Sequence, residues 1–427
     1  MPTAEPPLLI LSGVQGDPRR YRTFHLYEQA RLAGLNCHLS HVTDPRLREK
    51  AARASVIILH RAAFDSQVAW IEKEIHRNGG TLVNDLDDLV FDPAAVQYIH
   101  SPDFADLVRR SLYLEDVHRF RQTLDLCDHV IVSSDYLADR VRQLGKPASV
   151  HRNAFSFEMQ ALAGTAEPSS NRKSGKLVVG YASGTPTHDQ DFASIKPALL
   201  HILQQNPKTE LWLVGRLDPG KDWGAAQDRV KQIDFVPWRK LPEIQINFDI
   251  NLAPLQTDNP FGQSKSEIKY VEAALLSVPT IASPSDSYQY AIQPDQTGYL
   301  PASTQEWQAC LEELINHREQ RSAVGRNACQ DVRNRYHPSL RATQLVEILN
   351  CVGEGHDQFH YNPPVSQNLS ENKPLEFWSS AAVEKTPTLL QRGIYTLKYR
   401  SINTLLKQIW IYIRRMISPL FPFPNPP

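Results

Sequence analysis

The sequence is poor in cysteine and has no long apolar run. Its 427 residues include five cysteines, an odd number, and no two of them form a C-x-x-C pair. This pattern disfavours a disulfide scaffold or a zinc site and favours a reduced, cytosolic compartment. No run reaches the roughly 18 to 20 apolar residues that a membrane-spanning helix needs. The first residues also lack the basic-then-apolar order of a signal peptide, so we expect a protein that is cytoplasmic, either soluble or peripheral on a membrane.

An excess of charge of either sign is missing as well. The chain carries 46 basic and 47 acidic side chains, so no global field favours nucleic acid and we expect no nucleic-acid partner. The length is sufficient for about two to three domains of ordinary size.

Short apolar runs alternate with segments of helical length along two stretches of the chain. The first series includes residues 8–13, 54–60 and 81–85, and the second includes residues 177–182 and 210–215. Such alternation is typical of βαβ units in a doubly wound parallel sheet. We therefore predict an α/β protein with two Rossmann-like halves.

Polar segments without periodicity suggest the boundaries between these units. We expect an N-terminal half over residues 1–160, a linker over 161–176 and a C-terminal half over 177–352. A loose linker over 353–384 and a basic amphipathic tail over 385–427 then follow.

A cationic segment stands out in the C-terminal half. Residues 264–276 have the length and composition of a helix, which Pro279 closes. At 100° per residue, Lys265, Lys269 and Glu272 fall within about 60° of one another. The helix start and the two ammonium groups favour phosphate oxygens, and the carboxylate can accept a hydrogen bond from a ribose hydroxyl. The alternative is a solvated stripe of charges spaced three and four residues apart.

A glycine-containing loop follows the first apolar run of the same half. Gly184 lets the backbone approach a ligand closely, and Thr187 with Gln190 resembles a capping box. Ligands bind at the carboxyl ends of strands in such sheets, so Gly184 and Thr185 are candidates for phosphate contact. A simple turn is the alternative.

These two segments resemble motifs of GT-B glycosyltransferases in the group related to family 4. An N-x-F-x-x-x-K-S-x-x-K-x-x-E run followed by V-P-x-x-A-S is matched by Asn259, Phe261, Lys265, Ser266, Lys269, Glu272, Val278, Pro279, Ala282 and Ser283. A G-T-x-T-H-x-x-D-F run is matched by Gly184, Thr185, Thr187, His188, Asp191 and Phe192. The resemblance covers residues 8–350 and implies the GT-B fold, with the acceptor on the N-terminal half and a nucleotide-sugar on the C-terminal half.

The resemblance also implies roles for individual residues. Lys265 is expected to meet the diphosphate and Glu272 the ribose. The full donor-binding set is expected to comprise Gly184, Thr185, His188, Asn259, Phe261, Ser264, Lys265, Ser266, Lys269 and Glu272. The family usually has a second glutamate, which touches the transferred sugar, eight positions before the first; Ser264 stands there in this chain. The identity of the sugar therefore stays open.

Acidic residues gather at the end of the run at 81–85 and just after it. Asp85, Asp87 and Asp88 allow three interpretations: a cation site as in GT-A enzymes, cleft carboxylates that orient an acceptor hydroxyl, or a cap in a solvated loop. The resembled group carries a D-x-D-D-L-x-F element here and needs no metal for transfer. We therefore expect Asp87, Asp88 and Lys265 to be catalytic, with no metal and no cofactor besides the donor.

Several basic residues of the first half are further candidates. Arg19 and Arg22 follow the first apolar run and either reach the cleft or face solvent. His151, Arg152 and Asn153 match an R-N element of the family and are expected at the junction of the two halves.

The tail over residues 385–427 contains seven basic residues and no acidic one. Its segment 402–417 interleaves apolar residues with cations. Such a segment either lies on an anionic membrane surface, where each cation contributes about 1 kcal/mol, or docks on a domain as a final helix.

The sequence thus predicts a glycosyltransferase that moves a sugar from a nucleotide-sugar donor to an acceptor hydroxyl of a glycan or lipid-linked glycan. The resemblance implies retention of anomeric configuration. Two alternatives remain: a nucleotide-sugar-binding protein without activity, and a metal-dependent transferase that uses Asp85, Asp87 and Asp88.

Overall fold

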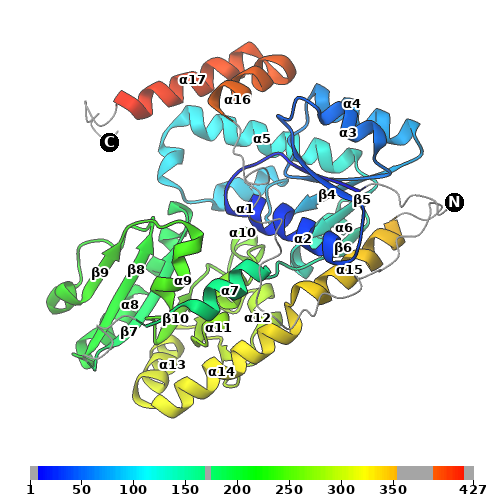
Figure 1. The fold of residues 1–427 in the computed structure, drawn as a ribbon. Coiled ribbons are helices and arrows are strands. Elements are labelled where there is room, and N and C mark those ends of the chain that lie inside the picture. Colours follow the sequence, from blue (N-terminus) through cyan, green and yellow to red (C-terminus); the bar gives the residue numbers. More distant parts are fainter. Residues whose placement is uncertain (1–7, 169–174, 353–387, 418–427) are drawn as a thin grey trace.

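The computed structural model describes residues 8–168, 175–352 and 388–417. Residues 8–168 form an N-terminal half, and residues 175–352 contain the C-terminal half. Each half is built on a six-stranded sheet (Figure 1). All strand pairs in both sheets are parallel. The two doubly wound sheets that the sequence predicts are therefore confirmed.

The N-terminal sheet has the strand order β2-β1-β3-β4-β5-β6. Its strands are β1 (Leu8–Ser12), β2 (Cys37–His41), β3 (Val56–His60), β4 (Thr81–Leu86), β5 (His129–Val132) and β6 (Ala148–Val150). The helices of this half are α1 (Asp17–Arg19), the π-helical segment η1 (Arg20–Phe24), α2 (His25–Leu32), α3 (Leu47–Arg53), α4 (Ser66–Arg77), α5 (Leu107–Leu126), α6 (Asp135–Gln143) and α7 (Phe157–Thr165), with 3₁₀ turns at Pro93–Tyr98 and Pro102–Ala105.

The C-terminal sheet has the order β12-β11-β10-β7-β8-β9. Its strands are β7 (Leu177–Ser183), β8 (Thr209–Gly215), β9 (Val230–Ile233), β10 (Ile250–Ala253), β11 (Thr280–Ala282) and β12 (Gly298–Tyr299). The helices are α8 (Asp189–Gln205), α9 (Leu241–Gln245), α10 (Pro260–Gln263), α11 (Ile268–Leu275), α12 (Asp286–Ala291), α13 (Thr304–Asn316), α14 (Arg318–Arg335) and α15 (Pro338–Val352), with 3₁₀ turns at Pro186–His188, Gly224–Arg229 and Trp238–Lys240.

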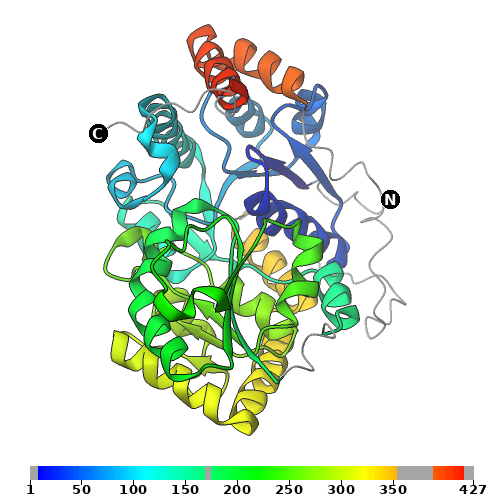
Figure 2. The ribbon, with the colours of Figure 1, turned by 90° about the vertical axis from the view of Figure 1, so that its left-hand side faces the viewer.

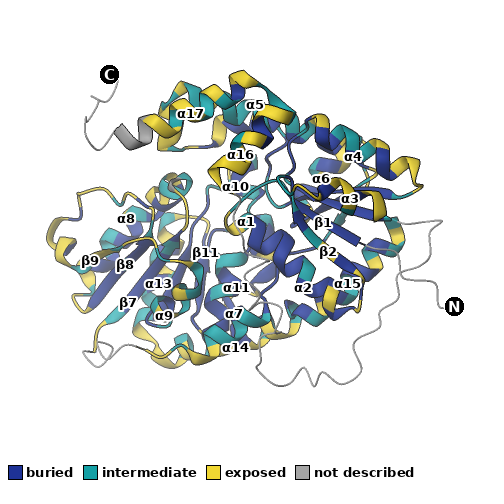
Figure 3. Cartoon of the chain, turned by 45° about the horizontal axis from the view of Figure 1, so that its top comes forward, coloured by how far each residue is buried: buried dark blue, intermediate teal, exposed yellow. Residues whose placement is uncertain are grey.

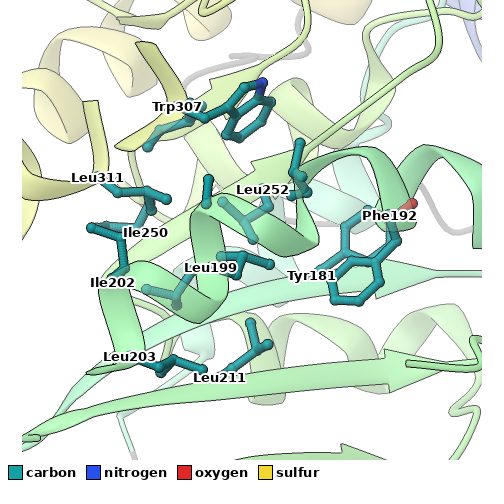
Figure 4. Close-up of a cluster of buried hydrophobic side chains, with 14 of the residues drawn as sticks. Tyr181, Phe192, Leu199, Ile202, Leu203, Leu211, Ile250, Leu252, Trp307 and Leu311 are labelled. Atoms are coloured by element: carbon teal, nitrogen blue, oxygen red, sulfur yellow. The ribbon is translucent and has the colours of Figure 1, made fainter. Parts of the chain in front are cut away.

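The central strands are apolar because helices cover both faces of each sheet. In the C-terminal half, side chains from β7, β8 and β10 interdigitate with those of α8 and α13 in one buried cluster (Figure 4). Tyr181 and Phe192 stack in this cluster with ring centroids 5.6 Å apart. Phe192, part of the G-T-x-T-H-x-x-D-F run, therefore anchors α8 to the sheet.

The last helix of the C-terminal half crosses to the N-terminal half. Leu345 and Leu349 of α15 are fully buried in the same cluster as Leu8 and Ile10 of β1, and α15 lies beside α2 (Figures 1 and 2). The segment 177–352 was expected to be a single C-terminal unit, but the apolar face of α15 is buried on the other half.

Two local expectations differ from the structure. The helix expected over 264–276 is interrupted, because α10 ends at Gln263 and α11 begins only at Ile268. Lys265 therefore lies in the intervening turn, whereas Lys269 and Glu272 lie on α11. The linker expected over 161–176 begins inside α7, which continues to Thr165.

The described part of the tail forms two helices. α16 (Leu389–Tyr395) continues into a π-helical segment, Thr396–Arg400, and α17 (Ile402–Ile417) folds back beside it. None of the helices in the described ranges combines the length and apolar character needed to cross a lipid bilayer. The glycosylation-like motif at 368–370 and the expected linker 353–384 lie outside the described residues.

Candidate active site

A cleft of about 780 Å³ separates the two halves. The loops that follow β1, β3 and β4 line it from the N-terminal half, and the loops that follow β7 and β10 line it from the C-terminal half. Because the strand order reverses at β7 and β10, these last two loops flank the switch point at which doubly wound sheets bind ligands. Among the lining residues are Gly16, Arg20, Tyr21, Arg61, Asp87, Asp88, Gly184, Thr185, His188, Phe261, Lys265, Ser266, Lys269 and Glu272.

Lys265 lies in the turn between α10 and α11 and faces the opposite half. Its Nζ is 2.8 Å from Oδ2 of Asp88 and 3.9 Å from the ring centroid of Phe261. Phe261 itself packs into the apolar cluster of Leu89 and Phe91 in the N-terminal half. The aromatic ring thus joins the halves and positions the lysine ammonium in the cleft.

Asp88 accepts two hydrogen bonds and lies beside a third cationic or polar partner. Besides Lys265, Ser264 donates its hydroxyl at 3.1 Å, and the guanidinium of Arg61 lies 3.5 Å away. Burial raises the pKa of Asp88, but the charges of Lys265 and Arg61 and the hydrogen bonds outweigh it and lower the pKa below the ordinary value. Arg61 also donates from Nε to Asp87 at 2.6 Å. Both carboxylates are thereby held as acceptors in the cleft.

Lys269 supplies a second ammonium group from the first turns of α11. It lines the same cleft, and its Nζ is 5.6 Å from the ring centroid of Tyr181. Burial lowers the pKa of Lys269, while the charges of Glu272 and Asp191 oppose this shift. The charged form of such a partly buried ammonium is stabilised when an anion binds beside it.

Glu272 lies one turn further along α11 and contacts the N-terminal half. It accepts a hydrogen bond from the hydroxyl of Tyr21, and Nη2 of Arg20 is 3.7 Å from its Oε1. Arg20 stacks between the rings of Tyr21 and Trp238, at 4.0 and 4.5 Å from their centroids. The carboxylate is therefore held in place from the opposite side of the cleft.

The loop after β7 is tied to the loop after β10. His188 contacts Oδ2 of Asp191 through Nδ1 at 2.8 Å, and Oδ1 of Asp191 accepts from the backbone N–H of Gln256 at 2.8 Å. Burial and the charge of Lys269 lower the pKa of His188. A β-carbon on Gly184 would have only Asp17 within 4 Å, at 3.9 Å. The backbone at Gly184 and Thr185 is thus open to the cleft.

Comparisons with known proteins show what this chain is similar to. Residues 196–347 match the family described as glycosyl transferase-like. HepE from Anabaena, whose structure contains UDP and glucose, superposes with a TM-score of 0.54 at 16% identity, covering 81% of this chain and 100% of HepE. The chain has the GT-B fold, and most of its C-terminal half is similar to the glycosyl transferase-like family.

Other solved structures share the fold of this chain. Sucrose-phosphate synthase from Thermosynechococcus elongatus has a TM-score of 0.55 at 15% identity, covering 82% of this chain and 100% of its own. A glycosyltransferase from Rickettsia africae has a TM-score of 0.58 at 10% identity, covering 83% and 100%. A search of curated proteins finds no match.

Two residues of the expected donor-binding set do not line the cleft. The side chain of Asn259 caps α10 by accepting from the backbone N–H of Gly262 at 2.8 Å. Ser264 is fully buried and acts through Asp88. Ser266 does line the cleft, where its hydroxyl accepts from the amide of Asn153 at 3.0 Å. The capping box expected at Thr187 is absent, since its hydroxyl pairs with that of Thr185 and His188 is the N-cap of α8.

Asp85 is separated from the other two aspartates of its cluster. It is fully buried, forms hydrogen bonds of 2.9 and 2.7 Å with the guanidinium of Arg22, and is 3.0 Å from Nδ1 of His60. The interpretation of the cluster as cleft carboxylates therefore does not hold for Asp85, because this residue lies within β4 and its side chain is buried, whereas Asp87 and Asp88 follow the strand and line the cleft. Across the part of the chain that the structure describes, no three His, Cys, Asp or Glu side chains form a group that could hold a metal ion.

The first-half basic residues fall into two groups. Arg19 lines the cleft, whereas Arg22 is buried beneath it and also donates to the carbonyl of His151 at 2.6 Å. Nη1 of Arg152 lies 3.8 Å from Glu267 of the other half. Together with the contact of Asn153 to Ser266, this places the R-N element at the junction of the halves.

Three cleft residues were missed in the sequence. Arg20 and Tyr21 lie on a helical segment that begins at Asp17. Arg61 follows β3 with a φ of 43°, a conformation that is uncommon outside glycine. Its position directly after an apolar run was the available signal, since strand ends meet at the same edge of the sheet.

Proposed function

We propose that this protein is a glycosyltransferase that transfers a sugar from a nucleotide-sugar to an acceptor hydroxyl, with the donor diphosphate bound at Lys265 and Lys269. The observation that carries the proposal is the location of both ammonium groups in the inter-half cleft, beside the open backbone at Gly184 and Thr185. HepE, which shares the fold, has also been solved with UDP-glucose. A nucleoside diphosphate matches the charge that these groups supply.

The chemistry of transfer explains why cations are needed there. Negative charge grows on the diphosphate as the bond to the sugar breaks, and preorganised donors stabilise that charge. Lys265, Lys269 and the backbone N–H groups of the Gly184 loop are the donors for this task. Glu272, fixed by Tyr21 and Arg20, accepts from the ribose. The transfer proceeds with retention of configuration and without a metal.

The acceptor enters from the N-terminal half in this proposal. Asp87 and Asp88 lie on that side, and Arg61 restrains both carboxylates. The lowered pKa keeps Asp88 ionised near neutral pH, so that it can accept a hydrogen bond from an acceptor hydroxyl and orient it. A hydroxyl of a glycan or of a lipid-linked glycan fits this role.

The test is release of nucleoside diphosphate from a panel of UDP-, GDP- and ADP-sugars. We expect the intact chain to turn over at least one donor and Lys265→Ala to lose about 100-fold or more in rate, because a charged phosphate contact made in the transition state is removed. Lys208→Ala is the matched control, since Lys208 is exposed in the turn before β8, at the opposite end of the sheet. Equal rates for the two variants would contradict the proposal, and binding without turnover of any donor would favour a non-catalytic nucleotide-sugar-binding protein.

A further inference from the structure

The described part of the tail, residues 388–417, forms a C-terminal hairpin on the N-terminal half (Figure 1). Tyr395 is buried in an apolar cluster of that half and donates its hydroxyl to Asp65, the N-cap of α4. Arg400 pairs with Asp116 of α5 at 3.0 Å, and Lys407 pairs with Glu115 at 2.5 Å. One face of the hairpin is thus fixed to α4 and α5.

The apolar stripe of α17 points the other way. Ile402, Leu406, Ile409 and Ile413 fall within about 60° of one another at 100° per residue, and all four are exposed. Thr404, on the opposite side of the helix, is buried. A helix that docks on a domain as its final element turns its apolar face inward, so α17 has the reverse orientation.

The exposed apolar surface continues over the whole hairpin. Ten of the fifteen large apolar side chains that the described residues expose belong to residues 388–417. Leu389, Leu390, Ile394 and Leu397 extend the surface from α17 onto α16 and the segment that follows it. The hairpin appears as the exposed outer layer next to α5 in Figure 3. A patch of this kind marks a site of contact with an apolar partner.

The charge of the hairpin identifies that partner. Residues 388–417 contain six basic side chains and no acidic one, and Arg392 and Lys398 are exposed. A second copy of the chain would bring like charges together across a symmetric interface. An anionic bilayer satisfies both features, because the acyl region accepts the apolar stripe and the headgroups attract the cations.

We propose that the C-terminal hairpin lies in the surface of an anionic membrane, with α17 parallel to it and the stripe Ile402–Ile413 inserted. Figures 1 and 2 both place the hairpin on the side of the N-terminal half that is remote from the C-terminal half. The helix that holds the hairpin, α5, also contributes Tyr113 to the cleft. The hairpin and the cleft are therefore connected through one helix.

The test is sedimentation of the full chain with vesicles of phosphatidylcholine alone or with about one-third phosphatidylglycerol. We expect binding to the anionic vesicles and a loss of roughly tenfold or more in partitioning for Leu406→Gln/Ile413→Gln. Leu340→Gln is the matched control, because this α15 residue is 40% exposed, close to the 48% of Ile413; it should bind as the parent does. Lys398→Glu tests charge independently and should reduce anionic binding about fivefold.

Several results would overturn the membrane assignment. Equal binding by the double variant and the parent would show that the apolar stripe does not contact the membrane. Equal binding to both vesicle types would show that charge does not contribute to binding. A parent chain that ignores vesicles but forms a concentration-dependent dimer, lost in the double variant, assigns the hairpin to a second copy instead. Nucleotide-sugar turnover is measured in the same preparations, so failure of the transfer proposal is distinguished from failure of this one.

Discussion

At the scale of single residues, the buried pair Arg22–Asp85 shows how a site is supported from below. Burial raises the pKa of Asp85, but the guanidinium of Arg22 and the contact with His60 outweigh it and lower the pKa to about 2. Asp85 fixes Arg22, which in turn donates to Asn153 at 3.1 Å. The network therefore joins β4 to the junction between the halves.

Asp85→Asn is expected to destabilise the protein by about 3–5 kcal/mol, because it leaves the buried charge of Arg22 without its counterion. The folded pKa of Asp85 lies below the ordinary value of 3.8. Its stabilising contribution is therefore complete above about pH 4 and declines as the pH falls toward 2. Denaturant unfolding of both proteins between pH 7 and pH 3 measures the difference in free energy of unfolding.

The control for this measurement is Asp139→Asn, which removes an exposed carboxylate paired with Arg142. That variant should unfold like the parent, since exposed pairs contribute little. A difference between Asp85→Asn and the parent that stays constant down to pH 3 would indicate that the carboxylate is not held in its ionised form.

Residue types and spacing indicated much of the candidate site but not its internal contacts. Lys265, Lys269 and Glu272 do line the cleft, because strand order alone places their segment at the switch point. Their partners Asp88, Tyr21 and Arg20 come from the other half, and a pairing between distant segments leaves no local pattern. Asn259 was misplaced because a capping side chain and a ligand-binding side chain share the same residue type.

At the scale of elements, the turn between α10 and α11 determines where Lys265 points. A β-carbon at Gly262 would lie 1.7 Å from the carbonyl oxygen of Gln256, a backbone atom that cannot rotate away. The glycine thus allows α10 to pack tightly against the preceding loop. In an uninterrupted helix over 264–276, Lys265 would be a helical residue and would not lie in the turn between α10 and α11.

Gly262→Ala is expected to displace this turn and to weaken nucleotide-sugar binding by about tenfold or more, since small misplacements of a binding group are costly. Gly164→Ala in α7 is the control, because a β-carbon there meets nothing within 4 Å. That change should leave binding intact and raise stability by roughly 0.5–1 kcal/mol. Titration calorimetry checks the first effect and thermal unfolding the second; unchanged affinity in Gly262→Ala would show that the turn adapts.

At the scale of the whole molecule, α15 makes the two halves interdependent. The periodicity of residues 338–352 predicts a helix but does not predict which half the helix covers. An apolar stripe shows that one face of a helix is buried, but it does not specify the surface on which that face packs. The order of elements favoured the C-terminal half, and the packing on β1 and α2 could be learned only from the structure. α15 thus packs on the N-terminal half, although it follows the elements of the C-terminal half.

Leu345→Ala is expected to destabilise the N-terminal half by about 2–5 kcal/mol, because it creates a cavity in the cluster that contains Leu8 and Ile10. Hydrogen exchange should show faster exchange in β1 and β3, while β7 and β8 keep their protection. Faster exchange confined to the C-terminal sheet would contradict this division of the cores.

In the proposed function, the cleft holds a nucleoside diphosphate against Lys265 and Lys269. The most direct measurement is titration calorimetry with UDP, GDP and ADP on the intact chain, on Lys265→Ala/Lys269→Ala and on Lys208→Ala. We expect tight binding of one nucleotide by the intact chain and by Lys208→Ala, with a loss of about 100-fold or more in the double variant. An unchanged dissociation constant in the double variant would contradict the proposal.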